Sequence, residues 1–384
     1  MKFQDMFLEE FLDFYDFMRV PLSSLERDTR QGDYRYYGAQ GVIDYIDAYI
    51  FDGQYILIAE DGANLVTRNE PIAFLVNGQF WVNNHAHIVK GKTGIADDYY
   101  ITTLLNSLNI AGFITGAAQP KLSQQNIKKI KIPLPDHPTQ KRIASILSTY
   151  DDLIENNRRR MALLEDAARQ VYQEWFVRLR FPGHEHTRIV DGVPEGWEKK
   201  RLGDVANINN ENLKSSYDGE IEYIDIASVS PGCIDETTKY EFRDAPSRAR
   251  RIVRHGDIIW SCVRPNRRSY AIIWQPVGNL IASTGFAVIS TKNLPTSYLY
   301  QAATSEQFVG YLNNHAKGAA YPAVVSADFE RAEIMVPTQS LVRSFNEIVE
   351  PMIEQGHCLK QQNQKLRTAR DLLLPKLMSG EIAV

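Results

Sequence analysis

The sequence predicts two globular domains of mixed α/β (α+β) structure, separated by two long helices that form an antiparallel coiled coil. Three observations lead to this prediction. The stretch "GAAQPKLSQQNIKKIKIPLP" (116–135) matches "GAAYPAVVSADFERAEIMVP" (318–337) at a constant offset of 202 positions, so the chain contains an internal repeat. Each copy precedes a segment whose apolar residues alternate in steps of three and four. A chain of 384 residues is also too long for one ordinary core.

Composition and charge are typical of a globular protein in a reducing compartment. Apolar residues make up 44% and charged residues 23% of the chain. The three cysteines lie far apart, which argues against disulfide and zinc frameworks. No apolar stretch is long enough to span a bilayer, and the acidic start "MKFQDMFLEEFLDF" is unlike a signal peptide. We therefore expect a cytoplasmic protein with no membrane partner. The net charge of −4 implies that any nucleic-acid partner touches only part of the surface.

Residues 1–136 are expected to form the first globular domain. Residues 54–62 and 83–91 have the composition of strands and end at turn residues. Residues 99–110 have a helical pattern, which Gly112 and Gly116 end.

Residues 137–181 are expected to form the first long helical segment. The segment contains no glycine, and its only proline lies at the start, where a helix tolerates one. The apolar seam comprises Ile143, Leu147, Tyr150, Ile154, Asn157, Met161, Leu164, Ala168, Val171 and Trp175. Asn157 is its one polar member, and such a residue reduces stability but fixes register. A helix over 140–178 would be about 55–60 Å long.

Residues 182–337 are expected to form the second globular domain. The stretch 180–197, which leads into this domain, contains two prolines and three glycines and is predicted to be a linker. Strands are expected within 220–227, 257–263 and 285–291.

Residues 338–384 are expected to form the second long helical segment. Its seam comprises Val342, Phe345, Val349, Met352, Gly356, Leu359, Asn363, Leu366, Arg370, Leu373 and Leu377. Gly356, Asn363 and Arg370 interrupt it, and Pro351 is expected to kink the helix or to end a first short piece. The two seams can cover each other as an antiparallel pair, which would relate the two domains by a pseudo-twofold axis.

Four stretches in this order resemble the specificity subunit of type I restriction–modification systems. "YYGAQGVIDYIDAYIFDGQYILIAEDGANL" (36–65) resembles the body of a target recognition domain, and "VPEGWEKKRLGDV" (193–205) resembles the opening of the second one. "EWFVRLRFPG" (174–183) and "LLLPKLMSGEI" (372–382) resemble the ends of the two conserved helical regions.

The resemblance implies a subunit without catalysis of its own, and with no cofactor. Such a subunit recognises a bipartite sequence in double-stranded DNA, one half per globular domain. Its helices set the gap and dock two adenine-N6 methyltransferase subunits, which would bind S-adenosylmethionine. A nuclease–translocase (restriction) subunit is a further candidate partner, and phage defence by DNA methylation and restriction is the implied role. Half-sites on one side of B-DNA lie about 34–36 Å apart per helical turn, a span that a rod of this length can hold.

The first domain departs from the family pattern at its start. The second domain opens with Gly196, Trp197, Leu202, Gly203 and Asp204, whereas the first has "DFMRVPLSSL" (16–25) after an acidic aromatic start. Phe17 is the expected substitute for the tryptophan.

Candidate DNA contacts in the second domain are mostly arginines, because the planar guanidinium can bind guanine O6/N7 or phosphate. They comprise Arg248, Arg250, Arg251, Arg254, Arg264, Asn266, Arg267 and Arg268. Asn266 could form a bidentate pair with adenine. The alternative is a solvated surface of a neutral domain.

Candidate contacts in the first domain lie in the repeated loop and near one strand. They comprise Gln119 and Lys121, with Tyr321 as the counterpart of Gln119, and Asn83, His85, Lys90, Lys92 and Tyr36. Loops of this kind expose side chains and allow close backbone approach to a ligand. The alternatives are a loop that only covers the start of the helix, and a packed core position for Tyr36.

Signatures of catalysis and metal binding are missing from the sequence. The pairs His85/His87 and His184/His186 lack further ligands nearby. "GKT" (91–93) lacks the earlier glycine of a phosphate loop, and there is no Gly-x-Ser-x-Gly motif. Two other hypotheses remain at this point: a stand-alone DNA-modifying enzyme, which would bind S-adenosylmethionine by itself, and a coiled-coil scaffold, which would not bind DNA.

Overall fold

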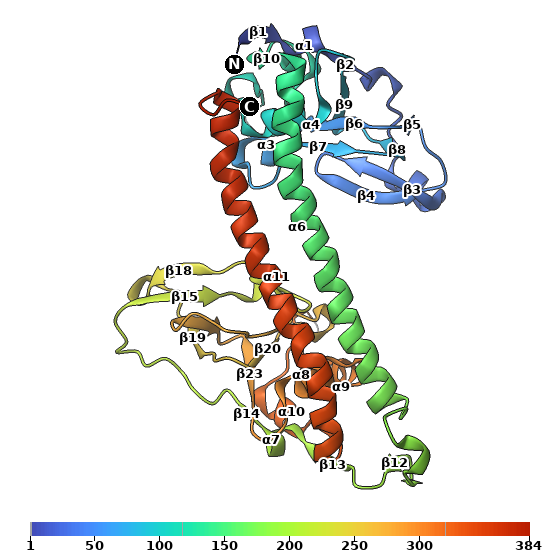
Figure 1. Cartoon of the computed structure of the whole chain (residues 1–384), viewed down its shortest axis with the longest axis vertical. Helices are drawn as coiled ribbons and strands as arrows, with labels where there is room; N and C mark the ends of the chain where they lie inside the picture. The colour runs from blue at the N-terminus through green and yellow to red at the C-terminus, as the bar shows by residue number, and fades with distance from the viewer. Residues whose placement is uncertain (1, 117, 319) are drawn as a thin grey trace. The chain divides into compact units, whose positions relative to one another are not determined.

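The structure, a computed structural model, describes residues 2–116, 118–318 and 320–384. The chain divides into two compact units. The first unit comprises the residues up to Asn156 together with Asn363–Val384, and the second comprises Asn157–Gln362. Each of the two long helices therefore contributes one part to each unit (Figure 1).

The first unit contains a strand pair and two four-stranded sheets. Its elements are β1 (Phe3–Phe7), α1 (Leu8–Phe11), β2 (Leu12–Phe14), α2 (Ser24–Asp28), β3 (Gln31–Gly38), β4 (Gly41–Ile46), β5 (Phe51–Asp52), β6 (Tyr55–Ala59), α3 (Asn64–Thr67), β7 (Ala73–Val76), β8 (Gln79–Val82), β9 (Ala86–Gly91), α4 (Asp98–Ser107), α5 (Gln124–Lys128), β10 (Lys131–Pro135) and the first part of α6 (His137–Tyr172). The strand orders are β1-β10, β2-β9-β6-β7 and β4-β3-β8-β5. Within the last sheet β3 and β8 are parallel.

The second unit repeats this topology. Its elements are β11 (Ile189–Val190), β12 (Val193–Pro194), β13 (Glu198–Arg201), α7 (Leu202–Val205), β14 (Ala206–Ile208), β15 (Glu220–Ile224), β16 (Val229–Ser230), β17 (Cys233–Ile234), β18 (Thr238–Glu241), β19 (Ala249–Ile252), β20 (Ile258–Ser261), β21 (Tyr270–Ile272), β22 (Leu280–Ser283), β23 (Phe286–Thr291), α8 (Thr296–Thr304), α9 (Glu306–His315), α10 (Ser326–Arg331), β24 (Glu333–Val336) and the first part of α11 (Gln339–Ser379). The orders β13-β24, β14-β23-β20-β21 and β18-β15-β22-β19 correspond to those of the first unit, and β15 and β22 are again parallel. The predicted duplication of a mixed α/β domain is confirmed.

The central strands are apolar on both faces because each lies between two cores. In β6, Ile56 and Ile58 belong to the core that α4 and α6 help to form, whereas Leu57 belongs to the core between the two sheets. In β20, Ile258 and Ile259 divide between two cores in the same way. Successive side chains of a strand point to opposite faces, so a continuous apolar run indicates a strand covered on both sides.

Most of the elements predicted from the sequence are present. The strands expected within 54–62, 83–91, 220–227, 257–263 and 285–291 are β6, β9, β15, β20 and β23, and the helix expected at 99–110 is α4. The predicted linker 180–197 is not wholly irregular, because β11 and β12 form a short hairpin. Asp191 and Gly192 turn this hairpin, both with positive φ, as a tight hairpin turn requires.

Helix α6 has a long and regular course. Asp136 accepts a hydrogen bond from the backbone N–H of Thr139 at 2.9 Å, which caps the helix start. The helix ends in a π-helical turn at Gln173–Val177, followed by Leu179 with a φ of 57°. All ten residues of the predicted first seam are buried or half-buried. The burial of Asn157 shows that its amide lies on the covered face.

Helix α11 is 41 residues long and continues through Pro351. The expectation that Pro351 ends a first short helix is therefore wrong. Pro351 is exposed, whereas Val349 and Leu359 on either side of it along the helix are buried. Packing of these apolar residues outweighs the one backbone hydrogen bond that proline removes.

Within each unit a part of α6 lies against a part of α11. In the first unit, Asn363 donates from Nδ2 to the carbonyl oxygen of Ile154 at 3.2 Å, and Leu377 packs in one core with Leu147. The residue with the higher number on α6 contacts the residue with the lower number on α11, so these parts of the two helices run antiparallel. In the second unit, Phe345 contacts the end of α6, with ring centroids 6.2 Å from Tyr172.

The first residues of the first domain are structurally equivalent to the opening of the second domain. The correspondence between their residues differs from the one that the sequence analysis expected. The N–H of Leu8 donates to Ile130 and that of Leu202 donates to Ala332, at 3.0 and 2.8 Å. Because β1 pairs with β10 as β13 pairs with β24, Phe3 lies opposite Pro135 and is equivalent to Trp197. The expectation for Phe17 is wrong: its side chain is 82% exposed, whereas Trp197 is 7% exposed.

None of the helices in the described ranges combines the length and the apolarity that crossing a membrane requires.

Candidate nucleic-acid interface

The repeated Gly-Ala-Ala-x-Pro motif forms the same loop in both domains. We define the loop frame as residues 60–62 with 115–122 in the first domain, and 262–264 with 317–324 in the second. In each domain, the loop folds back on itself and also pairs with the turn that follows the central strand, β6 or β20. Ala117 and Ala319, the second residues of the motif, lie outside the described residues.

Backbone hydrogen bonds of the loop frame repeat at the offset of 202 positions. Leu122 donates to the carbonyl of Glu60 at 2.7 Å, and Val324 donates to Cys262 at 2.9 Å. Lys121 and Thr115 exchange two backbone hydrogen bonds, as do Ala323 and Lys317. Gly62 and Arg264 donate to the carbonyls of Pro120 and Pro322, respectively. The sequence repeat therefore encodes one backbone structure in two copies.

The motif glycines are required by this structure. Gly116 and Gly318 have φ values of 85° and 102°, in the left-handed region that favours glycine. A Cβ at Gly116 would clash with the carbonyl oxygen of Gln119, and one at Gly318 would lie 2.9 Å from that of Tyr321. The tight turns leave the side chains of Gln119 and Tyr321 exposed. Equivalent loops thus present different side chains.

A further turn, which precedes β9 in the first domain and β23 in the second, is also equivalent between the two domains. Asn83 Oδ1 accepts from the N–H of His85 at 2.8 Å, and Ser283 Oγ accepts from Gly285 at 3.2 Å. The side chain of Asn83 is buried and shapes this turn, which argues against the predicted DNA contact of Asn83. His85 is exposed, and its Nδ1 lies 2.8 Å from Oδ2 of Asp61.

A charged network lies beneath the loop frame of the first domain. Glu60 pairs with Arg19 at 2.7 Å and with Lys121 at 3.1 Å. His87, which is 1% exposed, places Nδ1 2.6 Å from Asp16 Oδ2, while its Nε2 lies 2.7 Å from the carbonyl oxygen of Leu122. The network therefore anchors the loop backbone from below.

The network also changes the titration of its carboxylates. Burial by itself would raise the pKa of Asp16, but the hydrogen bond and charge of His87 hold that pKa below its usual value. Burial likewise opposes ionisation of Glu60, and its hydrogen bond to Arg19, with the charge of His87, lowers the pKa of that carboxyl. Both groups are thus held as anions within the domain.

Tyr36 and Lys92, two more predicted contacts of the first domain, form hydrogen bonds within the domain. Tyr36 is fully buried, and its hydroxyl accepts from the N–H of Leu22 at 2.9 Å, so the alternative of a core tyrosine is correct. Lys92 donates to the carbonyl oxygens of Glu9 and Glu10 at the end of α1, at 2.9 and 3.0 Å. Burial removes Tyr36 from the candidate interface, whereas the DNA contact of Lys92 stays a prediction.

Lys90 is half-buried, with its Nζ 5.3 Å from the ring centroid of Tyr55. Its role in DNA contact stays a prediction, as do those of Gln119, Lys121 and His85.

In the second domain, the turn after β20 brings Arg264 against the repeated loop. The guanidinium carbon of Arg264 lies 4.3 Å from the ring centroid of Tyr321. Asn266 and Arg267 are exposed on the same turn, and in the described part of the chain their side chains form no hydrogen bond or ion pair. Arg268 instead forms two hydrogen bonds to the carboxylate of Glu306, at 2.6 and 2.5 Å.

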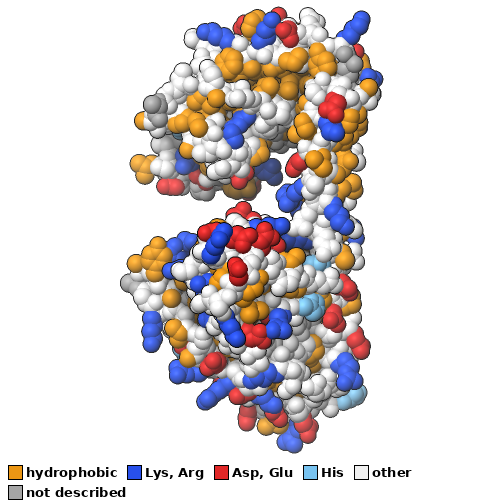
Figure 2. Space-filling model, turned by 90° about the vertical axis from the view of Figure 1, so that its left-hand side faces the viewer, with side chains coloured by type: hydrophobic (Ala, Val, Ile, Leu, Met, Phe, Trp, Pro, Cys, Tyr) orange, Lys and Arg blue, Asp and Glu red, His pale blue; other side chains and the backbone are white. Residues whose placement is uncertain are grey.

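The other four arginines lie on β19 and in the segments beside it, not on the Arg264 turn. Arg250 lies over the ring of Phe242 at 4.6 Å, Arg251 donates to Asn212 at 2.9 Å, and Arg254 pairs with Glu211 at 2.5 Å. Partial burial lowers the pKa of Arg251. Arg248 is exposed. Acidic and basic side chains are interspersed on the face of this domain seen in Figure 2.

Sequence reasoning did not identify Asp16 and Arg19, which form the network with Glu60 and His87. The sequence repeat gave one signal that the two loops have different surroundings. At the offset of 202, Glu60 corresponds to Cys262 and Gly62 corresponds to Arg264. Metal binding finds no support, since the described residues include no group of three or more His, Cys, Asp or Glu side chains that could hold an ion.

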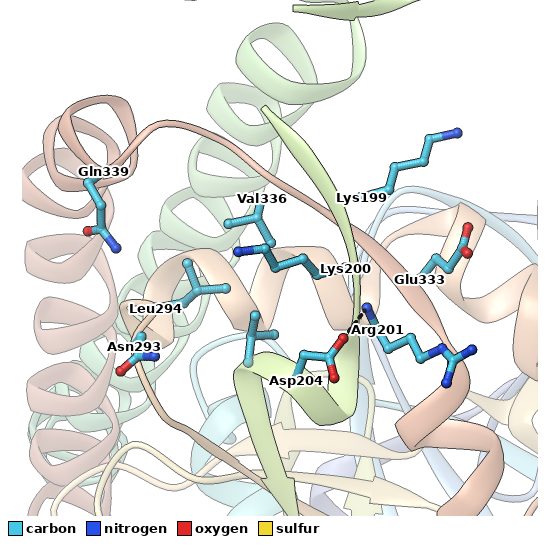
Figure 3. Close-up of a pocket in the computed structure, with 10 residues that line it drawn as sticks. Lys199, Lys200, Arg201, Asp204, Asn293, Leu294, Glu333, Val336 and Gln339 are labelled. Atoms are coloured by element: carbon cyan, nitrogen blue, oxygen red, sulfur yellow. Dashed lines mark hydrogen bonds between the residues drawn. The ribbon is translucent and has the colours of Figure 1, made fainter. Parts of the chain in front are cut away.

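A polar hollow lies away from the loop frame, at the base of the second domain. Its volume is about 560 Å³, and Lys199, Lys200, Arg201, Asp204, Asn293, Glu333 and Gln339 are among the residues that line it (Figure 3). Both cationic and carboxylate side chains line it, and the backbone N–H of Arg201 donates to Oδ2 of Asp204 at 3.2 Å. None of the predicted DNA contacts lines this hollow.

Two copies of one α/β domain, with the same loop frame and different exposed side chains, define a protein with two related recognition surfaces. Comparison with known families gives the class: the pattern described as "Type I restriction modification DNA specificity domain" matches residues 2–166 and 194–365, so the chain belongs to this family. As a member, it is a recognition subunit of a type I restriction–modification system and not a catalytic one.

Individual relatives agree with this assignment. The MjaIX specificity subunit of Methanocaldococcus jannaschii is 25% identical over 338 residues, which cover 84% of this chain and 78% of that protein. A putative type I specificity subunit of Haemophilus influenzae is 34% identical over 146 residues, covering 38% and 37%. The crystal structure of a type I S subunit from M. genitalium shares the fold, with a TM-score of 0.62 over 98% of this chain and 96% of that one, at 16% identity.

Proposed function

We propose that each globular domain of this specificity subunit reads one half of a bipartite sequence in double-stranded DNA through its loop frame. The supporting observation is the repeated loop frame, because equivalent backbone hydrogen bonds position Gln119 in one domain and Tyr321 in the other. Loops on a rigid scaffold are common positions for binding residues. Two equal frames with different side chains would recognise two different half-sites.

The helices supply the spacing in this proposal. Each seam is buried or half-buried along its length, as expected if α6 and α11 pair throughout as an antiparallel coiled coil. Such a pair would hold one domain near each of its ends, so that the two half-sites lie at a set separation. The proposed division of the chain is 1–136 and 182–337 for recognition, with 137–181 and 338–384 for spacing.

Partner docking is assigned to the outer faces of these helices. Leu153 and Leu163 on α6 and Leu372 on α11 are large apolar side chains exposed on the described surface. We propose that two adenine-N6 methyltransferase subunits cover them and supply S-adenosylmethionine and catalysis. A nuclease–translocase subunit would join through the methyltransferases.

The test uses the chain co-purified with its methyltransferase partner. Mapping of methylated adenines should give a bipartite motif, and DNA affinity should fall steeply as salt rises, because phosphate contacts release counterions. Inserting one heptad into each helix, at equivalent seam positions, should lengthen the gap and leave both half-sequences unchanged. An altered half-sequence with an unchanged gap would rule out the helices as the spacer.

A further inference from the structure

The backbone at Arg264 is in a conformation that suits glycine better than arginine. Its φ is 51° and its ψ 64°, in the left-handed region. The equivalent residue of the first domain is Gly62, with a φ of 110°. A residue with a Cβ is disfavoured there, and such strain is typically retained where the side chain has a function. The first domain shows that the loop frame forms without a side chain at this position.

The guanidinium of Arg264 contacts two neighbouring groups of the loop frame. Its central carbon lies 4.3 Å from the centroid of the Tyr321 ring, and Nη2 donates weakly to the carbonyl oxygen of Ala320 at 3.4 Å. The N–H of Arg264 is fixed to Pro322 at 2.7 Å. Tyr321 is 68% exposed, so this stacked pair lies at the surface of the loop frame. The remaining guanidinium donors form no hydrogen bond within the described ranges.

The free N–H groups of a guanidinium lie in one plane, so they suit two acceptors that lie in the same plane. In the major groove of duplex DNA that pair is O6 and N7 of guanine, the commonest base contact of arginine. A phosphate could accept the same donors, but phosphate contacts carry no sequence information, and the exposed Arg267 three residues further on can supply one. The position of Arg264 against a loop residue that differs between the two domains therefore favours the base edge.

We propose that Arg264, stacked on Tyr321, is a specificity-determining residue that hydrogen-bonds a guanine in the half-site of the second domain. The first domain has Gly62 and Gln119 at these positions and makes no such contact. This inference rests on the proposed function of the loop frame in DNA reading.

The experiment compares the DNA motif of the complete methyltransferase complex with that of its variants. Randomised duplex libraries and mapping of methylated adenines would be applied to the wild type, Arg264→Gly, Arg264→Lys and Tyr321→Ala, with Arg243→Ala as the control. Arg243 is an exposed arginine of the same domain, and within the described residues its ion pair is with its neighbour Asp244. Arg264→Gly installs the first-domain residue and removes the strain, so its unfolding temperature should equal or exceed that of the wild type.

The wild type should require guanine at one position of one half-site. In Arg264→Gly and Arg264→Lys, discrimination at that position alone should fall about 10- to 100-fold, and Tyr321→Ala should show part of this loss. The other half-site should be unchanged in all variants, and Arg243→Ala should retain the wild-type motif.

Two outcomes would overturn the inference. One is an unchanged motif in both Arg264 variants. The other is an equal loss of affinity for all sequences with a smaller salt dependence, which would identify a phosphate contact. A wild-type complex that yields no bipartite motif would instead contradict the proposed function itself, irrespective of Arg264.

Discussion

Arg370 on α11 forms an ion pair with Asp151 on α6 in the first unit, with Nη1 2.5 Å from Oδ1 of the carboxylate. The hydroxyl of Tyr99 on α4 donates to the other oxygen of Asp151. Burial and this carboxylate both raise the pKa of Tyr99. Partial burial opposes the charge of Arg370, but its hydrogen bonds to Asp151 and Asp371 raise its pKa. The arginine that interrupts the predicted seam thus has a partner on the opposite helix.

Replacing Asp151 with alanine should lower the free energy of unfolding by about 1 kcal/mol, because the side chains of Arg370 and Asp151 are 31% and 41% exposed and the pair is screened by solvent. Urea unfolding of the full chain would measure this, with Asp152→Ala, an exposed neighbour, as control. The loss should shrink at 1 M salt, since screening weakens the pair. An equal loss in the control variant would contradict a specific role for the pair.

Alanine at Gly116 should destabilise the first domain by about 1–2 kcal/mol, because the left-handed backbone and the Gln119 carbonyl leave no room for a Cβ. Gly112→Ala is the matched control, as nothing lies within 4 Å of its ideal Cβ. The unfolding temperature and the DNA sequence preference of each variant would be compared with those of the wild type. We expect Gly116→Ala to weaken preference in one half-site and Gly318→Ala in the other. Effects of Gly116→Ala on both halves would argue against two separate frames.

Acidification should destabilise the first domain through Asp16 and Glu60. Both carboxyls have a lower pKa in the folded chain than in the unfolded chain. Their contribution is therefore complete above the usual carboxyl pKa of about 4 and is lost as pH falls through the lowered folded values. Unfolding free energies measured from pH 6 to pH 2 should show this decline.

The Asp16→Asn variant provides the check on this assignment. It should cost about 3 kcal/mol at pH 7, because His87 and Arg19 lose a charged partner in a poorly solvated site. Its acid dependence should be flatter than that of the wild type. The exposed Asp13→Asn should change neither value, and a variant of Asp16 with the wild-type pH profile would show that other groups dominate.

Arg267→Ala should weaken DNA binding without affecting stability, since its side chain is exposed and forms no hydrogen bond or ion pair in the described residues. If it contacts one phosphate, the slope of log affinity against log salt should fall by about one. Unfolding free energy should stay within about 0.5 kcal/mol. Titration of the complex at several salt concentrations measures the slope, with Arg243→Ala as control. An unchanged slope would exclude a phosphate contact.

Sequence patterns were informative wherever a local rule decides the structure. Strand β6 and helix α4 follow from apolar runs and their end signals, and the burial of Ile143 and Leu377 follows from their seam spacing. The repeat was visible because Gly116 and Gly318 meet the same backbone requirement. Phe17 was misassigned because the shift in register at the chain start shows only in the pairing of β1 with β10.

Other site features depended on contacts between residues far apart in the chain. Tyr36 and Arg267 were both predicted to contact DNA, yet the side chain of Tyr36 is buried and that of Arg267 is exposed. His87 belongs to a network with Asp16 that is 71 positions away. The burial of one polar side chain and the contact between two distant residues leave no periodic pattern in the sequence. Both result from how separate elements pack.

By itself, the sequence determined that one domain design occurs twice and that each copy leads into a long helix with one apolar face. These features depend on glycine conformations and helical periodicity, which are local properties of the backbone. Only the tertiary structure decided which polar residues reach the surface of the loop frame, and that Arg264 lies on Tyr321 while Arg268 is paired with Glu306. Long side chains can reach several partners, and packing of distant segments selects among them.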